Sequence, residues 1–135
     1  MPVDLEIVSP EKLLLSRPVD MVVIPAAEGE MGVLVNHAPM IVLLQGGVIR
    51  LYQGDAVTDR LFVTGGFAEV TPERVTVLAD EAFALEALSR GEAERRLTAA
   101  QAEYEAVDKM DMAALNAAMD RVQSARAMLA AAPAG

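Results

Sequence analysis

Hydrophobic positions fall in short, strand-length segments separated by turns through roughly the first 80 residues and follow a helical period after that. Val3, Leu5 and Ile7 alternate with Asp4 and Glu6. Such alternation places the apolar side chains on one side of an extended chain and the carboxylates on the other. The chain therefore begins with a predicted strand that has one buried face.

Two segments are apolar at every position and predict strands covered on both faces. These segments are 22–24 and 40–44. Further apolar segments of strand length are 48–52, 61–63, 67–70 and 75–78. The connections 53–55, 64–66 and 71–74 contain glycine or proline, so each is expected to close a hairpin. About eight short strands at this spacing predict a β-sandwich or a small barrel.

Two helices are predicted at about 89–107 and 111–131, where apolar residues recur at spacings of three and four. Ser89 and Glu92 have the S-x-x-E spacing of a capping box, and Asp108 or Asp111 can cap the second helix. The connection is so short that the helices must run antiparallel. The larger residues of the expected seam between them are Leu97, Tyr104, Leu115, Met119, Val122 and Leu129.

Composition places the boundary between the two parts near residue 81. The segment before it holds 14 of the 16 valines, and the segment after it holds 18 of the 24 alanines, which marks a change from strand to helix. We therefore predict an α+β chain with a β-sandwich domain over 1–84 and an antiparallel helical hairpin over 85–135. The seam contains few large side chains, so the hairpin needs a docking surface and can be released at low cost.

The net charge and the composition disfavour several classes of function. The formal net charge of −9 disfavours binding to nucleic acid and to anionic lipid. The chain has no cysteine, no secretory signal at its N-terminus and no apolar run near the 20 or so residues of a membrane span, so direct membrane insertion is not expected. A protein that faces the cytosol and binds neutral or basic protein surfaces is the expectation.

Candidate chemistry is sparse. The one histidine, His37, has no nucleophile pattern to serve, and the glycine pairs do not form a phosphate loop. Glu28 and Glu30 fit a solvated turn or an acidic docking point better than a catalytic pair. No catalytic, cofactor-binding or metal-binding residues are therefore predicted. An interaction protein is favoured, and a ligand-binding sandwich with a helical lid is the rival class.

Three stretches together resemble the epsilon subunit of F-type ATP synthases. They are residues 5–11, residues 28–39 with 47–50, and residues 65–70 with 75–80. Their order and spacing match that family throughout the strand domain, and the hairpin covers the rest.

The resemblance implies a sandwich of ten strands and a non-catalytic place in the central stalk of a proton-driven rotary ATP synthase. The partners implied are the gamma subunit and the ring of c subunits, with contact to the alpha and beta subunits through the hairpin. The location implied is peripheral, on the cytoplasmic face of the inner membrane. The loops that face the c ring in that family correspond here to Glu28, Gly29, Glu30, Asn36, His37, Ala38 and Pro39.

One stretch departs from the family. Some members bind ATP at the hairpin through an L-D-x-x-R-A pattern, which residues 88–93 match except at Ser89 and Glu92. A glutamate in place of the arginine repels phosphate, so tight ATP binding is not expected. The family's hairpin can also inhibit ATP hydrolysis through basic residues on its second helix. Here the second helix has only Arg121 and Arg126 as basic residues. The sequence therefore does not decide whether this hairpin or another subunit inhibits ATP hydrolysis.

Overall fold

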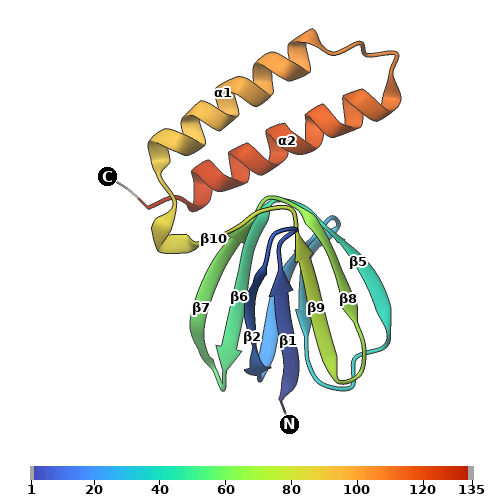
Figure 1. Cartoon of the computed structure of the whole chain (residues 1–135), viewed down its shortest axis with the longest axis vertical. Coiled ribbons are helices and arrows are strands. Elements are labelled where there is room, and N and C mark those ends of the chain that lie inside the picture. Colours follow the sequence, from blue (N-terminus) through green and yellow to red (C-terminus); the bar gives the residue numbers. More distant parts are fainter. Residues whose placement is uncertain (1, 134–135) are drawn as a thin grey trace.

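The computed structural model describes residues 2–133, in which ten strands are followed by a short 3-10 helix and two α-helices (Figure 1). Met1 and residues 134–135, the outer ends of the two predicted domains, lie outside the described residues. The predicted α+β class, a strand domain followed by an antiparallel helical hairpin, is confirmed.

The strands pair in the order β10-β7-β6-β3-β5-β8-β9-β1-β2, with β4 added beside β3. This sheet bends around one apolar core, so its two halves face each other as the layers of a sandwich (Figure 1). Neighbouring strands are antiparallel except β1 and β9. The strands are β1 (Val3–Val8), β2 (Leu13–Val19), β3 (Met21–Ala26), β4 (Gly29–Val33), β5 (Met40–Leu44), β6 (Gly47–Gln53), β7 (Ala56–Val63), β8 (Gly66–Val70), β9 (Arg74–Ala79) and β10 (Ala82–Ala84).

The alternation of β1 sets the core as predicted. Val3, Leu5 and Ile7 are each 0% exposed, whereas Asp4 on the opposite face is exposed. Each large aliphatic side chain buried in this way contributes about 1.5–3 kcal/mol through removal of apolar surface from water. The segment 22–24 is buried at every position, also as predicted.

Three strands escaped sequence reasoning. The apolar start of β2 is interrupted by Ser16, Arg17 and Pro18, β4 contains two glycines, and β10 has only three residues, so none of them was predicted. Each is held instead by backbone pairing to a strong neighbour. The side chain of Arg17 also pairs with Asp59 of β7, which connects β2, at one end of the strand order, to the strand next to the other end.

Two strand predictions were wrong. The segment 40–44 was expected to be covered on both faces, but Ile41 is 64% and Leu43 69% exposed, because in the described residues nothing packs on the outer face of β5. The segment 64–66 was expected to close a hairpin. It instead carries the chain from β7 to β8, which pair with different neighbours, so it crosses from one layer to the other.

The hairpin consists of α1 (Arg90–Ala106) and α2 (Met112–Ala131). The Ser89 side chain accepts a hydrogen bond from the Glu92 backbone, as predicted, and Asp111 caps α2 by accepting from Ala114. The Glu92 side chain does not complete the capping box, because its carboxylate pairs with two arginines of α1.

The hairpin lies against the sandwich, as its lean seam required. Met128 of α2 and Ala93 of α1 are buried together with Phe62 of β7. The 3-10 helix η1 (Leu85–Ala87) leads from β10 into α1 and adds Leu85 to the same cluster. We call the end of the sandwich that meets the hairpin the hairpin end and the other the far end (Figure 1).

Candidate functional site

The outer face of one layer carries five apolar residues in register across five strands. Strand pairing places Leu43 opposite Phe67, Phe67 opposite Leu78, Leu78 opposite Val8 and Val8 opposite Leu13. Four of them are well exposed, with exposed fractions of 69% for Leu43, 41% for Phe67, 37% for Leu78 and 56% for Leu13. We call these five residues the bare apolar row.

The other layer has a similar row that is covered. Phe83, Phe62 and Val48 are in register on β10, β7 and β6. Phe62 is 0% exposed because Met128 and the start of α1 pack over it. Both layers thus present an apolar row near the hairpin end, and within residues 2–133 only one of the two rows has a partner. Apolar patches of this kind on a folded surface mark sites of protein association.

A polar row lies next to the bare apolar row. It comprises Glu69, Thr76, Glu6 and Ser16, in register on β8, β9, β1 and β2, and it ends at the apolar Ile41 on β5. Arg74 donates a hydrogen bond of 2.8 Å to the Glu6 carboxylate. This outer face therefore has an apolar row with carboxylates along one side, which complements a partner that has an apolar centre and a basic rim.

The residues expected to face the c ring lie in two places. The turn before β4, with Glu28, is at the hairpin end, because Ala26 pairs with Leu44 just before Gly46 contacts α2. The turn 36–39 is at the far end, where the Asn36 N–H donates to the Pro72 carbonyl. The two groups are thus separated by the length of β4. The set comprises Glu28, Gly29 and Glu30 at one end and Asn36, His37, Ala38 and Pro39 at the other.

Glu30 already has a partner. Its carboxylate receives hydrogen bonds of 2.6 and 3.3 Å from the two terminal nitrogens of Arg50 on β6. These bonds lower the pKa of the Glu30 carboxyl below its ordinary value and raise the pKa of Arg50. Glu28 is exposed at the tip of the turn, so it is the carboxylate better placed for an outside partner.

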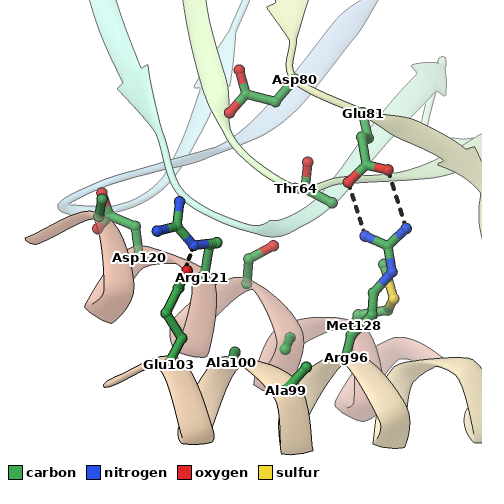
Figure 2. Close-up of a pocket in the computed structure, with 13 residues that line it drawn as sticks. Thr64, Asp80, Glu81, Arg96, Ala99, Ala100, Glu103, Asp120, Arg121 and Met128 are labelled. Atoms are coloured by element: carbon green, nitrogen blue, oxygen red, sulfur yellow. Dashed lines mark hydrogen bonds and ion pairs between the residues drawn. The ribbon is translucent and has the colours of Figure 1, made fainter. Parts of the chain in front are cut away.

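A cavity of about 570 Å³ lies between the hairpin and the hairpin end of the sandwich (Figure 2). Arg96 pairs with Glu81 at 2.8 Å and Arg121 pairs with Glu103 at 2.5 Å. Hydrogen bonds from Arg96 lower the pKa of Glu81 below its ordinary value. The lining also contains Asp80 and Asp120, so four carboxylates face two guanidinium groups, which leaves two net negative charges.

This donor set does not fit a nucleotide. Phosphate groups would have to displace Glu81 and Glu103 from their arginines in a cavity of net negative charge. Glu92, the residue that stands where some epsilon subunits have arginine, lies 3.5 Å from Arg96 and adds a further carboxylate beside it. Nor does the cavity suit the rival ligand-binding class, because its polar groups are largely paired with one another rather than converging on an empty point.

The predicted hairpin seam is mostly half-buried. Leu97, Tyr104, Leu115, Val122 and Leu129 are of intermediate exposure, and Met119 is 50% exposed. Tyr104, Met119 and Val122 line a groove between the helices on the flank away from the cavity. The buried positions of the two helices are mainly small residues, which let the helices approach closely: Ala93, Ala100, Ala118, Ser124, Ala125 and Met128.

Reactive groups are scattered. His37 is half-buried on a far-end turn, where its Nδ1 lies 3.1 Å from the Ala38 carbonyl oxygen. Among residues 2–133, no three His, Asp or Glu side chains are arranged to hold a metal ion. In the same part of the chain, neither helix is both long and apolar enough to cross a bilayer.

Sequence reasoning missed the bare apolar row and the contact between Gln123 and Gly46. Most row residues, such as Leu78 and Val8, are single outward apolar positions in their strands, and Leu43 shares the outer face of β5 with Ile41. Only the register of five strands aligns them. The Gln123 side chain meets Gly46 across 77 positions of sequence, with no local signal.

Several known proteins are similar to this chain in sequence. Residues 2–85 match the family described as the ATP synthase, delta/epsilon chain, beta-sandwich domain. The chain is 70% identical over 128 residues to the ATP synthase epsilon chain of Granulibacter bethesdensis, covering 95% of each chain. It is 52% identical over 132 residues to the epsilon chain of Gluconacetobacter diazotrophicus, covering 98% of this chain and 94% of that relative.

Two solved structures resemble the whole chain. A chain in the cryo-EM structure of the Euglena gracilis mitochondrial ATP synthase, OSCP/F1/c-ring, superimposes with a TM-score of 0.75 at 26% identity, covering 96% of this chain and 81% of that one. A chain in the Tetrahymena thermophila central stalk and c-ring structure gives a TM-score of 0.64 at 14% identity, covering 98% of both, and shows likeness of fold alone.

Proposed function

The chain belongs to the epsilon chain family of ATP synthases, and from this premise we propose that it is a non-catalytic subunit of the rotor stalk that docks on the gamma subunit through the bare apolar row. The two epsilon chains that establish this membership are matched over 95% and 94% of their length, so the similarity includes the hairpin. A stalk subunit needs surfaces that hold partners rather than groups that react, and the surfaces described above are of that kind.

The observation that carries this proposal is the contrast between the two apolar rows. The row on β10, β7 and β6 is covered by the chain's own hairpin, whereas the bare apolar row on the opposite layer is exposed. Association buries such surface with a gain of about 25 cal/mol per Å² of apolar area. A row that crosses five strands offers an extended contact surface.

We assign contact with the c ring to the acidic turn at the hairpin end, with Glu28 as the open carboxylate and Glu30 held by Arg50. An acidic turn can pair with basic groups on the polar loops of a ring. The far-end turn 36–39 is the alternative contact. Because the two turns lie at opposite ends of β4, a change in one leaves the other intact, so separate substitutions at Glu28 and His37 distinguish them.

The proposed location follows from the assembly. A subunit that rests on the ring lies at the membrane surface without entering the bilayer, on the cytoplasmic face of the inner membrane. The hairpin is a further proposed contact, with the alpha and beta subunits, when it leaves the sandwich. Its second helix offers Arg121 and Arg126 as basic groups, and Arg121 is engaged by Glu103 in the docked form.

Binding to purified gamma subunit tests the proposal. The variants Leu43→Asp and Phe67→Asp place a charge in the bare apolar row, and Leu34→Asp places one at a residue of similar exposure (54%) outside it. We expect the row variants to weaken binding at least about 100-fold because a desolvated carboxylate opposes association, and the control to change it less than about threefold. Row variants that stay folded by circular dichroism and bind like the parent would refute this docking face.

A further inference from the structure

The side-chain amide of Gln123 binds the backbone of Gly46 through both of its polar atoms. The Gly46 N–H donates to Gln123 Oε1 at 2.9 Å, and Gln123 Nε2 donates to the Gly46 carbonyl oxygen at 2.8 Å. A side-chain amide has the same donor and acceptor as a peptide group, so it satisfies Gly46 as a neighbouring strand would. The pair joins α2 to the turn between β5 and β6.

Gly46 is fitted to α2 by its missing side chain. A Cβ added there would lie 2.6 Å from Ser124 Cα and 2.8 Å from Ser124 Oγ. Gly46 is not among the glycines with positive φ, so its own backbone would accept another residue. Glycine is needed at this position only while α2 lies against the turn, and Ser124 is buried there with 8% of its surface exposed.

The other contacts between the hairpin and the sandwich are less directional. Met128 packs against Phe62 in an apolar cluster, and such packing tolerates small shifts. Arg96 pairs with Glu81, but both side chains are exposed by a third or more, which leaves the pair weak. Two hydrogen bonds with fixed geometry together with a steric fit are what define one position of the helix.

We propose that Gln123 and Gly46 form a latch that sets the docked position of the hairpin, with Gln123 as the positioning residue and Gly46 as the space that admits α2. Loss of either half shifts the hairpin toward the open form while the sandwich stays folded. The proposal concerns contacts within one chain and does not depend on the gamma subunit or the c ring.

A thiol probe tests the latch in the full chain, because the sequence has no cysteine and an introduced one is unique. M128C places the probe in the buried hairpin contact, where 3% of the native side chain is exposed, and V77C places it in the sandwich core at 0%. The measurement is the rate at which each thiol reacts with a disulfide reagent in native buffer. Opening of the hairpin is enough to expose the first probe, whereas the second needs unfolding of the sandwich.

Two variants disrupt the latch in different ways. Gln123→Met removes both hydrogen bonds at similar length, and Gly46→Ala inserts a methyl group where Ser124 lies. Each is expected to speed labelling of M128C by about tenfold or more, because a net loss near 1.4 kcal/mol is a factor of ten in the opening equilibrium. Labelling of V77C should change less than about twofold.

Each of the two variants has a matched control. Gln101→Met changes an exposed glutamine of α1, and Gly32→Ala adds a Cβ whose contact within 4 Å is Met21 Sδ at an ordinary 3.5 Å. Both should leave both labelling rates near those of the parent. The latch is refuted if Gln123→Met and Gly46→Ala behave like these controls. It is also refuted if they speed V77C as much as M128C, because that would mean general destabilisation.

Discussion

Leu43 of β5 lies directly opposite Phe67 of β8, and both side chains point away from the core. Because 69% of Leu43 is exposed, Leu43→Ser should change the free energy of unfolding by less than about 0.5 kcal/mol. Leu5 on β1 is 0% exposed, and Leu5→Ala should cost about 2–5 kcal/mol. Urea titration measures both, and a loss near 2 kcal/mol for Leu43→Ser would show that this face is already packed in the isolated chain.

The cap of the first helix gives a second prediction. The Ser89 hydroxyl accepts from the Glu92 N–H at 3.2 Å, so Ser89→Ala should remove about 1 kcal/mol from the helix start. Faster amide exchange in the first turn of α1 is the expected readout. Ser16→Ala, at an exposed strand position, serves as the control. Unchanged exchange in Ser89→Ala would mean that packing alone fixes this helix end.

Gly66 determines the path of the chain where it crosses from β7 to β8. Its φ is +130°, and a Cβ there would lie 2.1 Å from the Leu78 carbonyl oxygen. Gly66→Ala combines backbone strain with a clash against backbone, so we expect a loss of at least about 2 kcal/mol in unfolding free energy. Gly32→Ala meets an ordinary contact and should stay within about 1 kcal/mol of the parent. Thermal melts of the two variants compare them, and equal midpoints would contradict the strain.

The pair between Glu81 and Arg96 makes hairpin docking sensitive to acid. Hydrogen bonding to Arg96 lowers the pKa of Glu81 below 4.5, so the folded chain binds fewer protons there than the unfolded chain. The stabilisation is thus complete above about pH 4.5 and is lost as the pH falls through the folded value.

Both side chains are partly exposed, so the effect should be no more than about 1 kcal/mol. Stability measured from pH 7 to pH 3 should fall less steeply in Glu81→Gln than in the parent, because the variant has no carboxylate to protonate. Parallel curves for the two proteins would show that the pair contributes nothing.

The acidic cavity predicts weak nucleotide binding. Calorimetric titration of the isolated chain with ATP should give no saturable heat at low-micromolar concentration, because Asp80, Glu81, Glu103 and Asp120 oppose phosphate. The double variant Glu81→Gln with Glu103→Gln removes two of these charges and serves as the comparison. Low-micromolar affinity in the parent chain would overturn the electrostatic argument.

Much of the fold could be predicted from the sequence because local patterns of apolar and polar residues specify many of its strands and both helices. The alternation of Val3, Leu5 and Ile7 fixed one face of a strand, and Ser89 with its helical spacing fixed a helix start within one residue. The resemblance rested on segments of the same kind. Strands with an interrupted pattern, such as β2 with Arg17 and Pro18 or β4 with its two glycines, were not predicted, because pairing with a neighbouring strand holds them.

The surfaces were decided only by the tertiary structure. The alternation within a strand says which residues share a face, but not whether another element covers that face, which is why 40–44 was misjudged. The bare apolar row exists because five strands pair in one register, and the latch exists because α2 meets Gly46 from 77 positions away. The sequence by itself determined both helices, most of the strands and the family. Long-range packing decided which apolar residues remain exposed, because burial depends on neighbours that no local pattern specifies.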